Sequence, residues 1–300
     1  MTIETVGVIG AGVMGTGLAQ ALTQADFRVL LLDVSAGVLN KARDQITQGV
    51  RFQTLFKTRE SAQNNSIADK ITFSQDYAIL RDADFVIENI TEKWDLKKEV
   101  YKQIDTICPE HAVFAVNTSA IPIAHIASLT KRAPQVIGMH FMNPVPMKRM
   151  VEVIRSSHTS SETIAIAESL LTRMKKNYVL VNDSPGFVSN RVLMLTINEA
   201  IFLVDEGVAS AEEVDLIFKE CFAHKMGPLE TADLIGLDTI LYSIEVLHDN
   251  FKTDKYRPCR LLESMVEAGL HGRKSGQGFY TYERGQRISE ERQEKWTLTI

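Results

Sequence analysis

A glycine-rich turn between an apolar run and a helical pattern restricts the fold of this chain more than any other feature. The stretch VGVIGAGVMGTGLAQAL places Gly10, Gly12 and Gly15 in the spacing G-x-G-x-x-G, after a strand pattern and before a helix pattern. The first glycine allows the tight bend, the second lets a pyrophosphate approach the backbone, and the third lets the helix lie close to the strand. The helix start, with Val13 and Met14, offers free N–H groups to an anion, so we predict a dinucleotide-binding loop.

The next apolar run, FRVLLLD, ends in an acid at Asp33. This position suits a carboxylate that accepts hydrogen bonds from the adenosine ribose hydroxyls of a bound dinucleotide. Val34 and Ser35 follow, so no arginine is in place to hold a 2'-phosphate, and the Asp33 carboxylate would repel one. We therefore predict NAD as the cofactor rather than NADP.

Short apolar runs alternate with helical patterns from Thr5 to about Leu180, which indicates a parallel sheet wrapped by helices. We predict an α/β fold with a Rossmann-type, doubly wound parallel sheet over residues 1–185. The predicted strands cover 5–10, 27–33, 71–74, 84–90, 113–119, 136–141 and 178–183. The predicted helices are a glycine-opened one that ends at Leu22, then 35–56, 88–107 and 161–176.

The pattern changes after the Ser-Pro-Gly break at 184–186, and the later segments 191–208, 210–226 and 237–251 all have helical spacing. We predict an all-helical C-terminal domain over residues 186–285, followed by a polar tail or terminal helix over 286–300. Apolar helices such as RVLMLTINEAIFLV cannot all be hidden in so small a domain. We therefore expect this domain to contribute to the substrate cleft and to form a homodimer.

Composition excludes several classes of protein. The 300 residues carry a formal net charge of -5 and no dense Lys/Arg block, which argues against nucleic-acid binding. Three cysteines, Cys108, Cys221 and Cys259, lie far apart without metal-ligand spacing, so we expect reduced thiols and no metal. The chain starts directly with a strand pattern and has no apolar run of membrane-spanning length, so we expect a soluble, cytoplasmic protein without a membrane partner.

Three polar residues follow predicted strands or open the second domain: Ser119 in NTSA, His140 in MHFMNP and Asn190 in PGFVSNR. Ligands of open parallel sheets bind at the carboxyl ends of the strands, so Ser119 and His140 can converge on one site. Each residue also has a structural interpretation. Ser119 and Asn190 could cap helices, Glu152 could pair with a neighbouring arginine, and a single histidine is more often structural than catalytic.

Taken in order, the motifs of the chain resemble those of the 3-hydroxyacyl-CoA dehydrogenase family, and in length and layout the 3-hydroxybutyryl-CoA dehydrogenases. The resemblance covers nearly the whole chain. It is carried by VIGAGVMGTGLAQ, NTSAIPI, VIGMHFMNPVPMKRMVEVI, SPGFVSNR, HKMGPLETADLIGLD, KYRP and GRKSGQGFY. An ordered set of this kind makes a coincidental match of single residues a poor explanation.

The resemblance implies a role for each site residue. His140 matches the general base that takes the proton of the C3 hydroxyl while hydride passes to the nicotinamide, and Glu152 matches the carboxylate that orients its imidazole. Ser119 and Asn190 match residues that bind the substrate oxygens. The expected substrate is a 3-hydroxyacyl-CoA such as 3-hydroxybutyryl-CoA. The positions that match cofactor contacts of the family, besides the glycine loop, are Asp33, Glu92, Lys97, Ser119, Asn143 and Lys274.

The chain departs from the family pattern in three places. The serine and lysine that hold CoA, on the helix after the second strand, correspond to Gly49 and Phe56, with Arg51, Lys57 and Arg59 nearby. Lys148 stands where the family usually has an apolar residue. In ENITE, Asn89 and Thr91 replace small or apolar residues beside the cofactor.

These departures leave a second substrate class open. Relatives in secondary metabolism oxidise a polar 3-hydroxyacyl group, such as glyceryl, on an acyl carrier protein that serves polyketide extender-unit biosynthesis. A phosphopantetheine arm lacks the adenosine phosphates, so the loss of nucleotide contacts would cost such an enzyme little. Lys148 would then bind a polar acyl substituent or an acidic helix of the carrier.

Two further classes share the glycine loop. A beta-hydroxyacid dehydrogenase would use a lysine of the helical domain as its catalytic group, and His140 with Glu152 distinguishes this chain from that class. A crystallin-like relative would keep the fold and the NAD site without catalysis. The joint presence of Ser119, His140, Glu152 and Asn190 argues for an enzyme.

Overall fold

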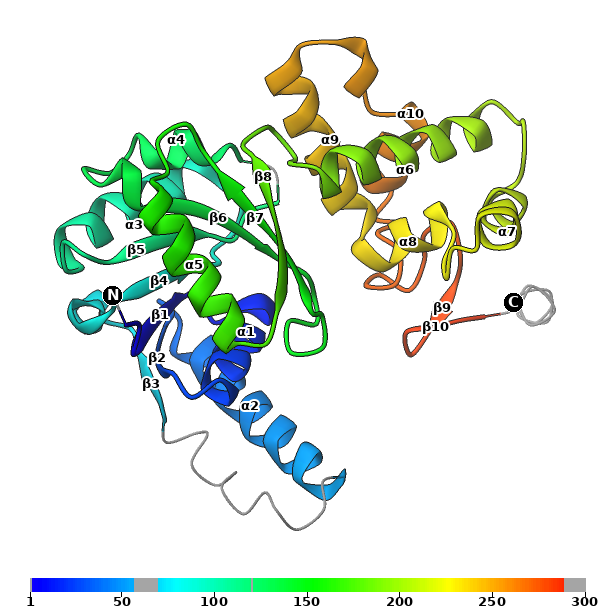
Figure 1. Ribbon diagram of the computed structural model, residues 1–300. Coiled ribbons are helices and arrows are strands. Elements are labelled where there is room, and N and C mark those ends of the chain that lie inside the picture. Colours follow the sequence, from blue (N-terminus) through cyan, green and yellow to red (C-terminus); the bar gives the residue numbers. More distant parts are fainter. Residues whose placement is uncertain (1, 57–69, 120, 289–300) are drawn as a thin grey trace. The chain divides into compact units, whose positions relative to one another are not determined.

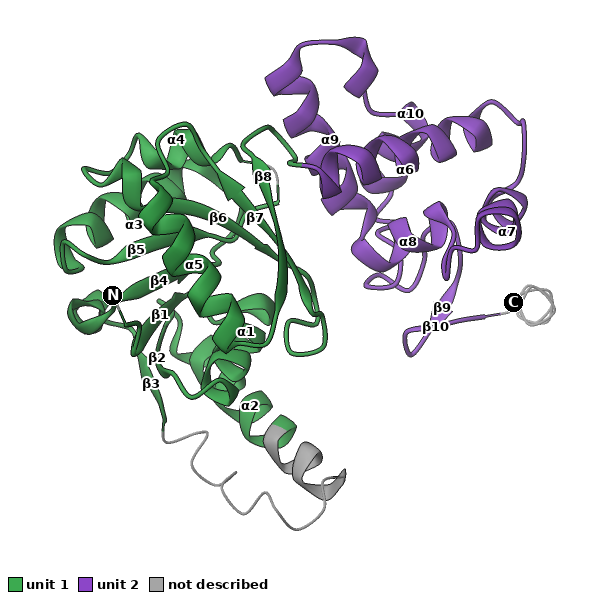
Figure 2. Ribbon diagram, viewed as in Figure 1, with its two compact units in different colours: residues 1–187 green, residues 188–300 purple. Residues whose placement is uncertain are grey.

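The computed structural model describes residues 2–56, 70–119 and 121–288, with the backbone alone for residues 50–56. The chain divides into two compact units, residues 1–187 and residues 188–300 (Figure 2). Unit 1 has two buried apolar clusters, and unit 2 has one of its own. No helix among the residues described is both long and apolar enough to span a membrane.

Unit 1 is built on one eight-stranded sheet with the spatial order β3-β2-β1-β4-β5-β6-β7-β8 (Figure 1). The first six strands along the chain run parallel, in the 3-2-1-4-5-6 order of a doubly wound dinucleotide-binding sheet. The predicted fold class is therefore confirmed. The strands are β1 Thr5–Ile9, β2 Arg28–Leu32, β3 Ile71–Ser74, β4 Phe85–Glu88, β5 Val113–Val116, β6 Val136–Phe141, β7 Met150–Arg155 and β8 Asn177–Asn182.

One strand, β7, was not predicted, and the strand direction reverses there. β7 runs antiparallel to β6, and β8 runs parallel to β7, so the sheet is mixed rather than purely parallel. A strand parallel to β6 would need a crossover connection, usually a helix. The segment 142–149 instead reverses the chain without a helix, so β7 pairs with β6 in the antiparallel direction.

Helices cover both faces of the sheet. The helices of unit 1 are α1 Val13–Gln24, α2 Ala36–Phe56, α3 Trp94–Ile107, α4 Ile123–Ala127 and α5 Ser161–Arg173, with the short η3 Tyr77–Asp82 and η4 Ala133–Gln135. Apolar residues of α1, α2 and α5 share one buried cluster with the sheet, and those of η3, α3 and α4 share the other. The helix predicted from residue 88 begins only at Trp94, because Phe85–Glu88 is a fully buried strand and Lys93 occupies the helix N-cap.

Unit 2 is helical with one short hairpin. Its elements are α6 Ser189–Asp205, α7 Ala211–Phe222, α8 Pro228–Ile235, α9 Leu237–Phe251, η5 Asp254–Tyr256, α10 Arg260–Glu267, β9 Tyr282–Glu283 and β10 Gln286–Arg287. The predicted helical C-terminal domain is confirmed, and the structure adds a short hairpin at its end whose second strand covers the first residues of the predicted polar tail. Arg284 and Gly285 both have positive φ and form a tight turn that pairs β10 with β9. Residues 289–300 of the predicted tail lie outside the described residues.

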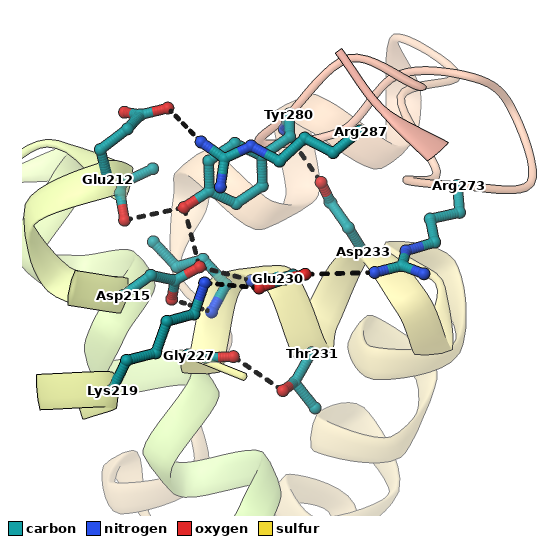
Figure 3. A network of polar contacts seen from close by, with 12 residues as sticks. Glu212, Asp215, Lys219, Gly227, Glu230, Thr231, Asp233, Arg273, Tyr280 and Arg287 are labelled. Carbon is teal, nitrogen blue, oxygen red and sulfur yellow. Dashed lines mark hydrogen bonds and ion pairs between the residues drawn. The ribbon is translucent and has the colours of Figure 1, made fainter. Parts of the chain in front are cut away.

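Two buried aspartates attach the segment 272–282 to the helices of unit 2 (Figure 3). Asp233 accepts hydrogen bonds from the backbone N–H groups of Phe279 and Tyr280 and from the Tyr282 hydroxyl, at 2.9–3.0 Å. Asp215 accepts from two backbone N–H groups at the start of α8, both at 2.8 Å, and from the Tyr280 hydroxyl at 2.7 Å. The contacts leave no room for side chains at the two glycines that face Asp233, because a Cβ at either would lie 2.0–2.4 Å from an Asp233 atom; these are Gly272 and Gly278.

Candidate active site

The loop between β1 and α1 has the shape that the glycine spacing predicts. Gly10 has φ +89° and donates its N–H to Leu32 O at 2.8 Å. A Cβ at Gly15 would lie 1.7 Å from Gly10 O, so only glycine lets α1 start this close to the strand. A Cβ at Gly12 would meet no atom within 4 Å, so the backbone of Gly12 borders open space. This cradle fits a pyrophosphate.

The start of α1 adds a favourable field for an anion. Gly12 is the N-cap and offers no side-chain oxygen to the first-turn N–H groups, and the first turn contains no acidic residue. The first i to i−4 bond of the helix runs from Thr16 N to Gly12 O, so the N–H groups of Val13, Met14 and Gly15 precede the helical ladder. Helix N-termini of this kind bind phosphate groups.

Asp33 lies at the carboxyl end of β2, beside the glycine loop. One carboxylate oxygen accepts from Ala11 N at 2.8 Å, and the other accepts from Ser35 N at 2.9 Å. The side chain is therefore fixed in orientation while remaining partly exposed. A partly exposed carboxylate at this place fits the two ribose hydroxyls of an adenosine, as the sequence predicts for NAD.

A buried ion pair lies at the carboxyl end of β4, next to β1 in the sheet. Lys97 on α3 is fully buried, and its Nζ lies 2.9 and 2.8 Å from the two carboxylate oxygens of Glu88 at the end of β4. Burial raises the pKa of Glu88, and the Lys97 ammonium counteracts this rise. Sequence reasoning missed Glu88, although an acid at the end of an apolar strand is an available signal.

Glu92 joins this pair to the loop that carries Ser119. The carboxylate of Glu92 accepts from Thr118 Oγ1 at 2.8 Å and from Ser119 N at 2.7 Å, and Lys97 Nζ lies 4.0 Å away. The structure therefore brings three predicted residues together: Glu92, Lys97 and Ser119. Their contacts with cofactor and substrate stay predictions.

His140 and Glu152 face each other across the antiparallel pair β6–β7. They are direct partners in the register, and His140 Nδ1 lies 3.3 Å from Glu152 Oε2. Both are buried, at 6% and 8% exposure. An ionised Glu152 accepts a hydrogen bond from Nδ1–H, which leaves the lone pair on Nε2. The Phe187 ring lies 5.9 Å from the imidazole, centroid to centroid.

The segment after β6 carries Asn143 and Lys148, both exposed. Lys176 stabilises this segment, because its buried Nζ donates to Val145 O at 2.7 Å and to Lys148 O at 2.8 Å. Burial lowers the pKa of Lys176. Sequence reasoning missed Lys176, whose role depends on contacts between distant parts of the chain.

The remaining predicted residues lie in unit 2 or on α2. Asn190 lies in the first turn of α6. Lys274 lies in the loop before β9 and forms an ion pair with Asp238 of α9. Gly49, one of the two positions that correspond to CoA contacts, lies on α2 beside Gln20. The side chains of Arg51 and Phe56, and residues 57 and 59, lie outside the described part of the chain. Within residues 2–56, 70–119 and 121–288, no group of three or more His, Cys, Asp or Glu side chains could hold a metal ion.

A doubly wound sheet with a phosphate-binding glycine loop, a ribose-binding acid and a histidine–carboxylate pair at its carboxyl edge defines a nicotinamide-dependent oxidoreductase. Comparison with known families gives the particular class. The model for "3-hydroxyacyl-CoA dehydrogenase, NAD binding domain" matches residues 5–184, and that for "3-hydroxyacyl-CoA dehydrogenase, C-terminal domain" matches residues 186–282. The chain belongs to the 3-hydroxyacyl-CoA dehydrogenase family.

Similar proteins agree over almost the full length. A probable 3-hydroxybutyryl-CoA dehydrogenase of Bacillus subtilis (strain 168) is 46% identical over 283 residues, 94% of this chain and 99% of that protein. The human mitochondrial hydroxyacyl-coenzyme A dehydrogenase is 33% identical over 287 residues, 93% of this chain and 91% of that protein. The crystal structure of (S)-3-hydroxybutyryl-CoA dehydrogenase PaaH1 from Ralstonia eutropha has a TM-score of 0.90 and 43% identity, and the match covers 94% of this chain and all of that one.

These findings confirm the prediction of an NAD-dependent oxidoreductase that acts on CH–OH groups. All three of these relatives are named for CoA thioesters, so the acyl-carrier-protein alternative finds no support in them. The match to the C-terminal domain of the family also separates this chain from a beta-hydroxyacid dehydrogenase.

Proposed function

We propose that the protein interconverts short 3-hydroxyacyl-CoA and 3-oxoacyl-CoA thioesters, with 3-hydroxybutyryl-CoA as a representative substrate. The pairing of His140 with Glu152 across β6–β7 carries the proposal, because it supplies a buried, oriented base at the sheet edge that also bears the glycine loop and Ser119. The names of the similar proteins support the acyl group.

Each protein group has a defined task in this reaction. His140 Nε2 takes the proton of the C3 hydroxyl, and Glu152 stabilises the imidazolium through Nδ1–H. Ser119 and Asn190 hold the substrate oxygens, which fixes the C3–H bond in a reactive orientation. Bound NAD supplies the hydride acceptor at its nicotinamide. In the reverse direction the imidazolium returns the proton to the carbonyl oxygen.

The glycine loop and Asp33 would hold the pyrophosphate and the adenosine ribose of NAD, and Glu92, Lys97, Asn143 and Lys274 complete the proposed cofactor contacts. Lys148 is proposed to contact the substrate, since it is exposed on the segment that follows His140. A homodimer and a cytoplasmic location stay predictions. Self-association is supported by three exposed apolar residues of α7, Leu216, Ile217 and Phe222. Light scattering tests it by measuring the mass of the particle in solution.

The central test is a substrate panel with NADH absorbance as the readout. CoA esters of 3-hydroxy acids with increasing chain length are compared with one another and with a 3-hydroxyacyl carrier protein. We expect the highest kcat/KM with a short CoA ester. Turnover of the carrier-protein ester alone would refute the proposed substrate class.

His140→Gln tests the mechanism on the same panel. We expect kcat to fall by about 10²- to 10⁴-fold, the usual contribution of a positioned general base. His158→Gln, at an exposed histidine of the same unit, is the matched control and should keep wild-type turnover. Unchanged turnover of His140→Gln would remove His140 from the mechanism.

A further inference from the structure

Two asparagine side chains form a hydrogen-bonded bridge across the carboxyl edge of the sheet. Asn89 follows β4 and Asn117 follows β5, and both are partly buried. Asn117 Nδ2 donates to Asn89 Oδ1 at 2.6 Å, and Asn89 Nδ2 donates to Ile87 O at 3.0 Å. At the other end, Asn117 Oδ1 accepts from Phe141 N at 3.1 Å. The bridge therefore runs from β4 through β5 to the residue after His140.

The backbone groups at the two ends fix the orientation of both amides. Ile87 C=O can only accept, so the nitrogen of the Asn89 amide must face it. Phe141 N–H can only donate, so the oxygen of the Asn117 amide must face it. The inner contact then pairs the one remaining oxygen with the one remaining nitrogen, and all three hydrogen bonds have a single polarity.

The bridge continues the sheet beyond the point where the strand backbones separate. The last backbone pair of β4 and β5 is Glu88 with Val116, and the last pair of β5 and β6 is Val116 with Gly138. Further along, the Asn117 side chain supplies the β5 partner for the Phe141 N–H group. On its other side, the end of β6 pairs with β7 through His140 and Phe141. The bridge thus binds the end of β6 on the side that faces β5, beyond the last backbone pair of the two strands.

Asn89 also touches the cofactor loop. Its N–H donates to Ile9 O at 2.8 Å, and a Cβ at Gly10 would lie 2.9 Å from Asn89 O. The same residue therefore contacts the glycine loop through its backbone, and its side chain contacts Asn117, which in turn binds the N–H group of Phe141 on the His140 strand. Asn89 is one of the positions at which this chain departs from the small or apolar residues of the family.

We propose that Asn89 is a positioning residue of the active site, which acts through Asn117 to fix the end of β6, and with it His140, relative to the cofactor loop. The inference rests on the proposed role of His140 as the base. In Asn89→Ala the Asn117 amide loses the acceptor of its nitrogen, so its oxygen holds Phe141 N–H less firmly. The His140 imidazole then samples orientations that do not meet the substrate hydroxyl.

The test compares Asn89→Ala, Asn117→Ala and the double variant, with kcat, both KM values and the thermal unfolding midpoint measured for each. We expect Asn89→Ala to lower kcat about fivefold, the factor that corresponds to one net hydrogen bond, with little change in the KM for substrate. The double variant should have the same kcat as Asn117→Ala, because both residues act in one chain of contacts. Asn250→Ala, at an exposed asparagine on α9, is the control and should match the wild type.

Asn89→Asp separates orientation from packing. Its shape is nearly that of asparagine, but a carboxylate oxygen would face Ile87 O, where no hydrogen bond forms. A carboxylate oxygen can still accept from Asn117 Nδ2, so we expect its kcat at saturating NAD to lie between those of the wild type and Asn89→Ala. If the kcat of Asn89→Asp is no higher than that of Asn89→Ala, or if the effects of the two alanine substitutions simply multiply in the double variant, the positioning role is refuted. These outcomes leave the proposed function intact, which only the substrate panel and His140→Gln can overturn.

Discussion

The two units both bury carboxylates, and they compensate the charge in different ways. In unit 1, Glu88 is fully buried against a fully buried lysine, Lys97. In unit 2, Asp215 and Asp233 accept hydrogen bonds from backbone N–H groups and tyrosine hydroxyls (Figure 3). In unit 1 the compensation comes mainly from one cation, supplemented by the Ile90 N–H group at 2.6 Å, whereas unit 2 distributes it over several dipoles.

The difference matters for how each unit responds to substitution. Removing one partner of a buried ion pair leaves an isolated charge in a medium of low dielectric constant, which is costly. Removing one of several hydrogen bonds leaves the others in place, so the cost per contact is smaller. The pair lies at the sheet edge beside Glu92 and Ser119, whereas the aspartates attach the segment that carries Lys274. Disruption in unit 1 should therefore affect stability and turnover together.

The largest effect is expected from Lys97→Met, because Glu88 would remain buried without its cation. We expect the free energy of unfolding to fall by about 3–5 kcal/mol, measured by urea denaturation. Adding Glu88→Gln should recover much of this loss, since the double variant buries no charge. Lys102→Met, at an exposed lysine paired with Glu99, is the control and should change stability by under about 1 kcal/mol. A small cost for Lys97→Met would show that the pair is dispensable.

Buried thiols allow the effect to be assigned to a unit. Cys108 is buried in unit 1 and Cys259 in unit 2, whereas Cys221 is exposed. Burial raises the pKa of Cys108 to about 12 and also raises that of Cys259, so both react only when their unit opens. In a Cys221→Ser background, Lys97→Met should accelerate labelling of Cys108 more than that of Cys259. Equal acceleration of both would mean that the two units open together.

A smaller effect is expected from Asp233→Asn in unit 2. An amide cannot accept all the hydrogen bonds that converge on this carboxylate, and its NH₂ group would face a donor. We expect a loss of about 2 kcal/mol, with faster labelling of Cys259. Asp249→Asn, at an exposed aspartate, is the control. A loss as large as that of Lys97→Met would contradict the contrast between the two units.

The cost of Asp233→Asn should depend on pH. Burial raises the pKa of Asp233, although its hydrogen bonds from Tyr280, Phe279 and Tyr282 oppose the rise. The stability from such a group is fully present below its unfolded pKa of about 3.9 and is lost as pH rises through the folded pKa. The stability difference between wild type and Asp233→Asn should therefore shrink in urea titrations as the pH rises from about 3.9 through the raised folded pKa of Asp233. A difference that grows with pH would reverse the sign of the shift.

The sequence predicted the local features of unit 1 well. The glycine loop, Asp33 and six of the parallel strands follow from patterns within short windows. His140 and Glu152 were paired by resemblance, and the reason for their contact is the register of β6 against β7. β7 itself was not predicted, although the β-branched residues of MVEVIR are a strand signal.

Contacts between distant segments could not be predicted. Asn117 and Lys176 gain their roles from partners that only the fold brings close. The hairpin that follows Tyr280 has the polar sequence of a tail, and its order depends on contacts with α7. Arg287 is the clearest example, since its pairing could not be inferred from the local sequence.

The smallest effect is expected at that hairpin. The Arg287 guanidinium lies 3.5 Å from the Tyr280 ring centroid, and its NH2 lies 3.3 Å from Glu212 Oε1, with both charged side chains partly exposed. We expect Arg287→Ala to cost about 0.5–1 kcal/mol in urea denaturation, because solvent weakens the ion pair while the planar stacking contributes more. Arg287→Lys keeps the charge without the plane and should recover less than half of that loss. Full recovery by lysine would show that charge alone stabilises this contact. The exposed site would then resemble the ion pair of unit 1, rather than the hydrogen-bonded aspartates of its own unit.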